Sequence, residues 1–440
     1  MTQARGRDMP ESSRAGHRRG APIGTAAAAP PGGGSQAPVG TTAVAAPPTR
    51  RRAALIILLA GSTLTVLAGA VLAPVVELFR TELRLGGAAA GLILTAHGLS
   101  LAVAGPLVGR AIDRWGVRVP LAAGLILYGL AGGAGLVTDS YPALIATRLL
   151  FGVGAAVVFA GTTLGLLNLY EGAARDRAMG WRSAAISIGG VLFPLAGGLL
   201  GTLSWHAPFA AYLIGVPLGL LTLRALPDHR PGPPGGAGRP GSMVALLRDR
   251  PALVGIYGLQ ATCTLLLYAV LVFLPLRLAE VGVTDTTVVA IFAGVQSLVM
   301  TLVGLGYARI RGRWGQRHLL VVAFATWLVA LTVLGLTGAT ALMLAASAVF
   351  GIGMGLAVPA LTVLVADHSP VDRRGQATAL LASAIFAGQF VSPLLLGPVA
   401  AAGSTRAAFL AAAALTGVIL AVLSLSSSFG RSRTTTCVPR

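Results

Sequence analysis

Long apolar stretches of about twenty residues recur along the whole chain and constrain its fold more than any other feature. Of the 440 residues, 55% are hydrophobic and 11% are charged, which is too apolar for a soluble protein of this length. A helix of about 20 residues crosses the ~30 Å hydrocarbon core of a bilayer and satisfies its own backbone there, whereas barrel strands would alternate strictly. We predict spans near residues 54–77, 87–109, 119–137, 142–167, 179–202, 208–226, 252–276, 286–307, 318–337, 340–365, 377–400 and 405–427.

The chain repeats itself at an offset of 199 positions without a gap. Residues 114–118 match residues 313–317 around a shared tryptophan, and Phe151-Gly152 matches Phe350-Gly351. Further matched pairs are Gly105 with Gly304, Arg175 with Arg374, Gly189 with Gly388, and Pro194 with Pro393. Because Trp occurs only five times, chance does not explain these matches. We therefore predict an all-α integral membrane protein with twelve transmembrane helices in two pseudo-symmetric six-helix bundles, residues 53–226 and 251–427.

The positive charge, +19 with 33 arginines and no lysine, lies mostly in alternate loops and at both ends. Since cytoplasmic loops carry the excess of arginine, we expect a multi-pass protein of the cell membrane, plasma or inner, with both termini cytoplasmic. We expect no nucleic-acid partner, because no compact basic domain is present. The other loops hold Arg80, Arg84, Arg277 and Arg406, and Arg148 lies inside a span.

Three segments outside the spans are expected to be cytoplasmic. Residues 1–52 are rich in Gly, Ala, Pro, Ser and Arg and cannot bury a core, so we predict a disordered tail and no secretory signal peptide. As an alternative, residues 50–52 contact anionic lipid. Residues 227–250 form a linker between the bundles, flexible over its Pro/Gly-rich first part, and residues 428–440 form a second tail.

Chemistry-bearing residues are not grouped in the spans. Cys263 lies within a span and Cys437 in the tail, so neither a disulfide framework nor a metal spacing exists, and we expect no metal and no cofactor. A membrane enzyme would need a nucleophile, metal or paired-carboxylate cluster. A passive channel would need a ring of selective groups, whereas polar residues here are sparse. These absences favour a transporter over an enzyme or a channel.

Residues 105–118, with the sequence Gly-Pro-Leu-Val-Gly-Arg-Ala-Ile-Asp-Arg-Trp-Gly-Val-Arg, resemble the loop G-x-x-x-D-R-x-G-x-[RK] of the major facilitator superfamily. Gly109 permits close helix approach, Gly116 allows a tight turn, and Asp113 can accept bonds from arginines or a helix N-terminus. We interpret the segment as a conformational latch, with a simple topology anchor as the alternative. Its proposed members are Gly109, Asp113, Arg114, Gly116 and Arg118.

The resemblance covers roughly residues 53–427, although the second copy has Gly312 in place of Asp113. It implies two bundles that rock about a site near the bilayer midplane. A second match, Arg148-Leu-Leu-Phe-Gly152-Val-Gly154, is similar to the pattern R-x-x-x-G-x-G of the same family. Because an arginine about 9 Å inside a span needs a cavity or a partner, we predict that Arg148 pairs with Glu77 and takes part in coupling. Alternatively, Glu77 is an ordinary interfacial carboxylate.

The fifth predicted span resembles the antiporter motif G-x8-G-x3-G-P-x-x-G-G of the superfamily, except that Phe193 replaces one glycine. The resemblance implies export. Small residues allow close helix contact, and Pro194 bends a helix, so generic packing remains the alternative. The motif residues are Gly180, Gly189, Pro194, Gly197 and Gly198.

Single polar residues inside spans supply the other candidates. His97, near the middle of the second span, titrates near neutral pH and is a candidate proton carrier or a hydrogen-bonded packing residue. The offset places Gln296 at equivalent depth in the eighth span. By resemblance Gln260, Tyr268 and Gln389 line the central cavity with Gln296, as substrate contacts or as interhelical bonds.

No acidic residue lies near the middle of any predicted span, so Glu77, Asp113 and His97 remain as titrating groups. An electropositive cavity at Arg148 favours a neutral, apolar or anionic substrate. We predict a monomeric secondary transporter that exports a small organic molecule from the bilayer-embedded site in exchange for protons. Proton-coupled uptake of a small metabolite or anion is the alternative.

Overall fold

The structure is a computed structural model that describes residues 48–227, 243–370 and 373–425. Residues 1–47 and 428–440 of the predicted tails and residues 228–242 of the linker lie outside these residues, as does the side chain of Asp113. Residues 48–52, predicted as part of the disordered tail, are helical and begin the first helix, Pro48–Ala70, so this boundary of the prediction is wrong. Contacts from Ala46 to Arg440 form one unit. All regular elements of the described residues are helical, and twelve of them are long and apolar enough to cross a membrane. The predicted fold class is confirmed.

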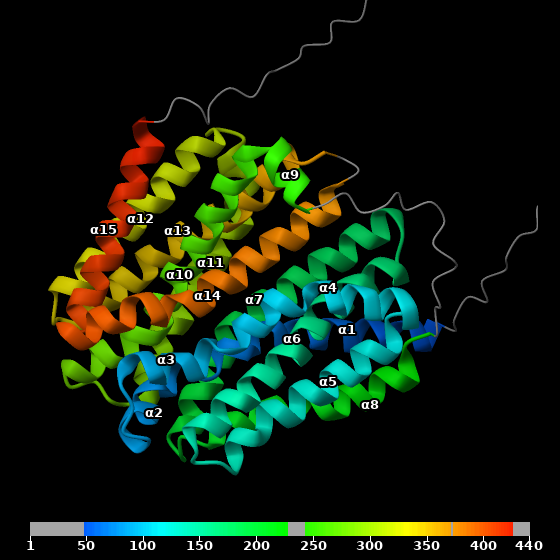
Figure 1. Cartoon of the computed structure of the whole chain (residues 1–440), viewed down its shortest axis with the longest axis horizontal. Coiled ribbons are helices and arrows are strands. Elements are labelled where there is room, and N and C mark those ends of the chain that lie inside the picture. Colours follow the sequence, from blue (N-terminus) through cyan, green and yellow to red (C-terminus); the bar gives the residue numbers. More distant parts are fainter. Residues whose placement is uncertain (1–47, 228–242, 371–372, 426–440) are drawn as a thin grey trace, which may run out of the picture. The chain divides into compact units, whose positions relative to one another are not determined.

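The first six spans are built from eleven helical segments (Figure 1). Several spans consist of two segments, because prolines or glycines interrupt the regular α-helix. The segments are α1 (Pro48–Ala70), η1 (Ala73–Val75), α2 (Val76–Glu82), α3 (Gly87–Thr95), α4 (His97–Trp115), α5 (Arg118–Gly133), η2 (Ala134–Leu136), α6 (Tyr141–Leu169), α7 (Gly172–Gly201), η3 (Ala207–Ile214) and α8 (Gly215–Ala225), where η1 to η3 are 3-10 turns.

The second six spans are single uninterrupted helices. A short helix in the linker, α9 (Met243–Asp249), precedes them. The spans are α10 (Pro251–Glu280), α11 (Thr286–Arg311), α12 (Gln316–Leu336), α13 (Thr340–His368), α14 (Arg374–Ala402) and α15 (Thr405–Leu425).

The pairing of helices is the same in both halves. In the first half α6 packs against α4 and α5, α5 against α8, and α1 against α7. In the second half α13 packs against α11 and α12, α12 against α15, and α10 against α14. Each second-half pair is the counterpart of a first-half pair at the offset of 199. The duplication seen in the sequence is therefore a duplication of structure.

Matched glycines make matched contacts within the two halves. A Cβ on Gly152 would collide with the carbonyl oxygen of His97, and a Cβ on its counterpart Gly351 would collide with that of Gln296. Gly154 likewise lies against Tyr128, and its counterpart lies against Trp327. Since only glycine allows such approach, the repeated Phe-Gly-x-Gly segments fix α6 and α13 against equivalent neighbours.

Helix ends follow from local sequence. Proline stands in the first turn of α6 and α10, where its missing N–H is not needed. Asp285 caps α11, because its side chain accepts hydrogen bonds from the backbone nitrogens of Thr287 and Val288. Gly116 ends α4 with φ of 72°, a conformation that favours glycine. The tight turn predicted at Gly116 is present.

Two spans extend beyond their predicted ends on the side where α2 and α3 meet. The first continues through η1 and α2 to Glu82, and the seventh continues to Glu280. The seventh therefore includes Arg277, whose predicted place in a loop is wrong. The linker is also partly regular, because α9 occupies its last third.

The halves contact each other through two symmetric pairs of spans (Figure 1): α7 packs against α11, and α14 packs against α3 and α4. We call the end that carries the loops 116–117, 170–171 and 312–315 the arginine-rich side, and the other end the opposite side. Further contacts between the halves join α10 to α2, α3 and η1, and α11 to η1.

Candidate functional site

Arg148 is completely buried in α6 and is surrounded by aromatic rings. Its guanidinium carbon lies 4.7 Å from the ring centre of Phe151, 5.0 Å from Phe209 and 4.9 Å from Tyr212. Nη2 donates a hydrogen bond to the carbonyl oxygen of Gly132 at 2.6 Å. Nε and Nη1 have no hydrogen-bond partner among the described residues. The charge is therefore held mainly by ring faces and one carbonyl.

We call the rings of Tyr128, Phe151, Phe209 and Tyr212 around Arg148 the aromatic cage. Its two tyrosines donate hydrogen bonds to α1. Tyr128 donates to the carbonyl oxygen of Leu64 at 2.7 Å, and Tyr212 donates to that of Ala68 at 2.9 Å. The rings of Tyr128 and Phe151 also lie 4.4 Å apart. Because buried tyrosines hold their hydroxyls to fixed acceptors, the cage is a rigid connection between α1, α5, α6 and η3.

The predicted pair between Arg148 and Glu77 is wrong. Glu77 lies in α2 and makes two hydrogen bonds with Arg80, at 2.6 and 2.8 Å. The turn η1, which contains Pro74, separates α1 from Glu77. Arg80 lies one helical turn after Glu77 and therefore forms the ion pair with its carboxylate. Glu77 is therefore a carboxylate of the opposite side and does not reach Arg148.

His97 connects this cage to the second half. Its ring meets Phe151 edge-on, with centres 5.4 Å apart, and its Nε2 lies 2.9 Å from Nε2 of Gln389 in α14. The amide nitrogen donates and the ring nitrogen accepts, so in the neutral imidazole the proton is on Nδ1. His97 Nδ1 has no partner among the described residues. Phe151 thus contacts both Arg148 and His97. His97 in turn bonds Gln389 of the second half.

The other predicted cavity residues lie at different places. Gln296 lines a cavity of about 10 Å³ with Ala73 and Pro74 of the first half. The hydroxyl of Tyr268 lies against Gly69 of α1. These two candidates, like Gln389, therefore lie between the halves.

Gln260 is also buried in α10. Its Nε2 is 3.5 Å from Thr264 Oγ1, while its Oε1 has no partner among the described residues. It remains a candidate without a contact to the first half.

The antiporter-like motif divides along α7. Gly197 lies against the carbonyl of Val71, and Gly198 lies against α11, where Thr286 Oγ1 donates to its carbonyl oxygen at 2.7 Å. Gly189 lies against the ring of Phe193, and Pro194 stands inside the helix. A Cβ on Gly180, toward the arginine-rich side, would meet no described atom within 4 Å.

The proposed latch is open in this structure at Gly109, where an added Cβ would meet no described atom within 4 Å. The close approach predicted there is absent. Asp113 lies in the last turn of α4, and its side chain is outside the described residues. Arg114 is exposed and lies over Trp115 at 5.8 Å.

Arg118 donates to the carbonyl oxygen of Leu223 at the end of α8. Its counterpart Arg317 bonds the carbonyls of Leu423 and Ser424 at the end of α15, at 3.2 and 2.7 Å. Each loop arginine therefore joins the third and sixth spans of its own half.

The two sides of the interface differ. Toward the opposite side, a Cβ on Gly91 would lie 2.6 Å from Val272 and 2.9 Å from Pro393. Contact continues inward to Ser383, whose Oγ donates to the carbonyl oxygen of Ala102 at 3.4 Å. Beyond this point a Cβ on Gly105, like one on Gly109, would meet no described atom within 4 Å. The halves touch on the opposite side and part toward the arginine-rich side.

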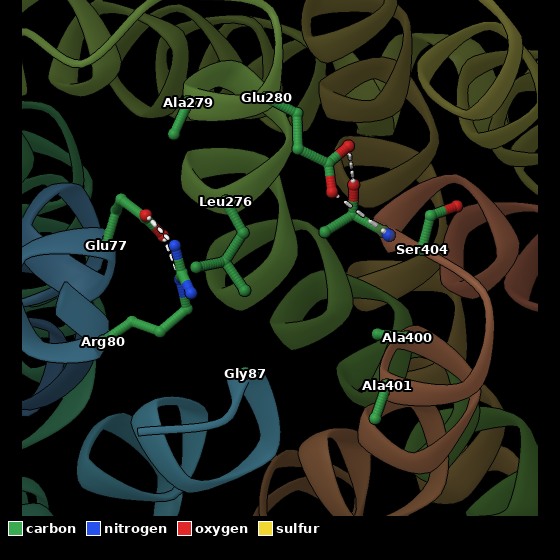
Figure 2. A pocket seen from close by; sticks show the side chains of 10 residues that line it. Glu77, Arg80, Gly87, Leu276, Ala279, Glu280, Ala400, Ala401 and Ser404 are labelled. Carbon is green, nitrogen blue, oxygen red and sulfur yellow. Dashed lines mark hydrogen bonds and ion pairs between the residues drawn. The ribbon is translucent and has the colours of Figure 1, made fainter. Parts of the chain in front are cut away.

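A cavity of about 340 Å³ lies between the halves on the opposite side (Figure 2). Figure 2 shows the pair Glu77–Arg80 on one wall and Glu280 on the other, with Leu276 between them. Glu280 accepts a hydrogen bond from Thr405 Oγ1 at 2.7 Å and pairs with Arg277 at 3.0 Å. Both carboxylates that line the cavity, Glu77 and Glu280, thus already have partners.

Residues missed from the sequence include the cage aromatics and two arginines inside spans, Arg182 and Arg277. Arg277 was assigned to a loop, because charge at the end of an apolar run suggests a boundary. Arg182 fell inside the predicted span 179–202 but was not singled out. Tyr128 and Tyr212 give only a weak signal, as isolated hydroxyls in apolar runs. No cluster of three or more His, Cys, Asp or Glu suited to a metal occurs among the described residues.

The family follows from comparison with known proteins. The model of the Major Facilitator Superfamily matches residues 58–309 and 260–435, so the chain belongs to this family of membrane transporters. Proteins of the family bind small-molecule substrates within the membrane. The chain is therefore a multi-pass membrane protein of a transporter family, and no catalytic activity is indicated.

Relatives include drug-resistance proteins. Multidrug resistance protein 1 of Bacillus subtilis (strain 168) is 30% identical over 162 residues, which are 36% of this chain and 41% of that protein. Quinolone resistance protein NorA of Staphylococcus aureus is 28% identical over 158 residues, 36% of this chain and 40% of that protein. The matched part thus spans about two fifths of these relatives.

A solved D-xylose-proton symporter superposes with a TM-score of 0.68 at 16% identity, covering 84% of this chain and 97% of that one. At this identity the likeness establishes the shared fold alone.

Proposed function

We propose that this chain is a secondary active transporter that exports a small organic molecule by alternating access in exchange for protons. The supporting observation is the asymmetric interface, closed at Gly91 and Gly198 and without close contact at Gly105 and Gly109. In that arrangement a site between the halves is reached from the arginine-rich side. Rocking of the two halves would expose the same site to the opposite side.

Direction and location rest on charge and on the relatives. The arginine-rich side is the cytoplasmic side by the positive-inside rule, so both tails and the linker are cytoplasmic, in the plasma or inner membrane. The antiporter-like residues of α7 and the drug-resistance names of the relatives support export. The proton-coupled symporter of the same fold makes uptake the second candidate.

Coupling is proposed to run through His97 and Arg148. Neutral His97 accepts a hydrogen bond from Gln389, and a proton on Nε2 would remove that acceptor and add a charge beside the cage. Protonation of His97 would then weaken the contact between α4 and α14. Phe151, in contact with both side chains, connects this event to Arg148.

The closing step on the arginine-rich side is proposed to use the latch. When the halves approach there, Gly109 allows close contact and Asp113 accepts hydrogen bonds from arginines or a helix N-terminus. Arg114 is exposed and able to take part, whereas Arg118 holds α5 to α8 within its half.

Substrate is proposed to contact the polar residues between the halves, Tyr268, Gln296 and Gln389, and Gln260 on α10. The functional unit is a monomer in the lipid bilayer, because one chain supplies both halves. Neither nucleic acid nor a cofactor takes part.

Proteoliposomes loaded at defined pH test this proposal, with cargo chosen by an accumulation screen in a host that lacks its own exporters. A gradient acidic on the opposite side should drive cargo against the proton flow. Movement of cargo with protons would establish uptake instead, and flux that ignores the gradient would refute coupling.

A further inference from the structure

Three arginines of the membrane spans, Arg148, Arg182 and Arg277, differ in how their nitrogens are satisfied. Arg277 is fully partnered: it donates to the carbonyls of Leu334 and Thr337, at 3.5 and 2.8 Å, and pairs with Glu280 at 3.0 Å. Arg148 has a carbonyl and three ring faces. Arg182 has neither a hydrogen bond nor an ion pair among the described residues.

The guanidinium of Arg182 is set inside the protein. Its Nε and Nη2 atoms are covered and lack hydrogen-bond partners among the described residues, although the side chain as a whole is half-buried. Arg182 lies ten residues into α7, about 15 Å along the helix from its start on the arginine-rich side. Because its covered nitrogens lie within the predicted span 179–202, an unpaired guanidinium here is costly and indicates a functional partner.

Arg182 stands beside a place where the halves meet. Its guanidinium carbon lies 5.8 Å from the ring centre of Phe159 in α6, and Phe159 meets Phe386 of α14 edge-on, with ring centres 5.7 Å apart. Arg182 and Phe159 belong to the first half and Phe386 to the second. A molecule bound here would therefore touch both moving parts.

Among the described residues, no carboxylate pairs with Arg182. Glu77 and Glu280 line the cavity of the opposite side and are paired with Arg80 and Arg277. A planar guanidinium binds a carboxylate through two parallel hydrogen bonds, and aromatic rings hold an apolar or aromatic group edge-on.

We propose that Arg182 is the anion-binding residue of the cargo site and that the cargo is an amphipathic organic monocarboxylate. Its carboxylate bonds Arg182, and its apolar or aromatic part packs against Phe159 and Phe386. This inference rests on the proposed transport function and narrows its substrate class from a small organic molecule to an organic anion.

The test is binding of 4-phenylbutyrate to the purified full-length protein in neutral detergent, compared with its uncharged methyl ester. The wild-type protein should bind the acid saturably and more tightly than the ester. Arg182→Gln should weaken acid binding about tenfold or more and leave ester binding unchanged, because a charge-assisted bidentate bond is lost. Arg182→Lys should fall between, since an ammonium cannot form the bidentate bond.

Arg175→Gln is the matched control, because Arg175 is an exposed arginine of the same helix, and this variant should bind like wild type. Phe159→Ala should weaken acid and ester alike. Equal loss of acid and ester in Arg182→Gln, unchanged acid binding in that variant, or no acid binding by the wild-type protein would each overturn the inference.

Failure of transport is distinguishable from failure of this inference. Binding of the acid through Arg182 without any proton-driven flux in proteoliposomes would refute the proposed transport function and leave the anion site intact. Proton-driven flux of other cargo without binding of the acid would support the proposed transport function and refute the anion site at Arg182.

Discussion

The two halves of the molecule share a fold but not a chemistry. Where the first half has Arg148, the second has Ser347, which bonds only the carbonyl of Met343 in its own helix. Where the first has Tyr128, the second has Trp327, which donates to the carbonyl oxygen of Phe350. Duplication preserved the helix positions and the glycine contacts, whereas the buried charge at the position of Arg148 is present in the first half only.

This difference assigns roles to the halves. The first half carries His97 and the two span arginines that have no acidic partner, Arg148 and Arg182. The second half contributes neutral partners, Gln389 and Phe386, across the interface, and its buried Arg277 is paired with Glu280. Coupling chemistry in one half and neutral contacts in the other is sufficient for a rocking mechanism, because a proton need change only the contact between them. Four substitutions test this assignment.

Arg148→Ala should have the largest effect and abolish coupled transport, because the cage loses the charge around which its rings are arranged. Proton-driven flux in proteoliposomes measures it. The matched control is Ser347→Ala at the equivalent place, which should transport like wild type since only a bond within its own helix is lost. Unchanged pH dependence in Arg148→Ala would remove this residue from coupling.

Asp113→Asn should slow transport by about tenfold or more while leaving membrane insertion intact, because an ionised acceptor of the latch becomes neutral. Initial rates of flux, normalised to inserted protein, measure this. The counterpart Gly312→Ala should be nearly silent, since an added Cβ there meets neighbours only at 3.5 Å or beyond. Normal turnover of Asp113→Asn would refute the latch.

His97→Gln should remove the pH response while keeping much of the maximal rate. Acidification protonates His97 and breaks its bond with Gln389, whereas an amide at this position does not titrate near neutral pH. The wild-type rate should therefore vary with pH, and the variant profile should be flat. Gln296→Asn is the control in the other half and should retain the wild-type profile. A persistent pH response in His97→Gln would exclude His97 as the proton carrier.

The smallest expected effect is the difference in stability loss between two equivalent substitutions, one in each half, which should be near zero. Gly152→Val and Gly351→Val should each destabilise the protein by about 1–3 kcal/mol or more, because each side chain would collide with an equivalent carbonyl. Thermal unfolding in detergent measures both, with Gly255→Val as a control where no described atom lies within 4 Å. Unequal losses would show that the halves differ in packing as well as in charge.

Sequence patterns predicted the parts of this fold that depend on period and length. Twelve apolar runs and one offset predicted the spans and the two bundles. The matched glycine contacts of α6 and α13 emerged only from the structure. Hydropathy did not locate helix ends, so Arg277 was assigned to a loop, although its bonds to Leu334 and Thr337 hold it inside the fold.

The candidate site was less predictable, because its partners are not encoded in composition. Arg148 was expected to pair with an acid, but its partners are ring faces and a carbonyl, which no sequence pattern identifies. Glu77 forms its ion pair with Arg80, which is nearer to it in the sequence than Arg148. At Gly109 the close approach expected from the sequence is absent, because an added Cβ would meet no described atom within 4 Å.

Spin-label distances across α7 and α11 test the central claim, that the two halves alternate about a shared site. One label pair at Arg177 and Arg309 reports on the arginine-rich side, and a second at Thr202 and Thr284 reports on the opposite side, with Cys263 and Cys437 replaced. Addition of cargo or acidification should shorten the first distance and lengthen the second. If both distances stay constant or change in the same direction, the halves do not rock about a common site and the account is wrong.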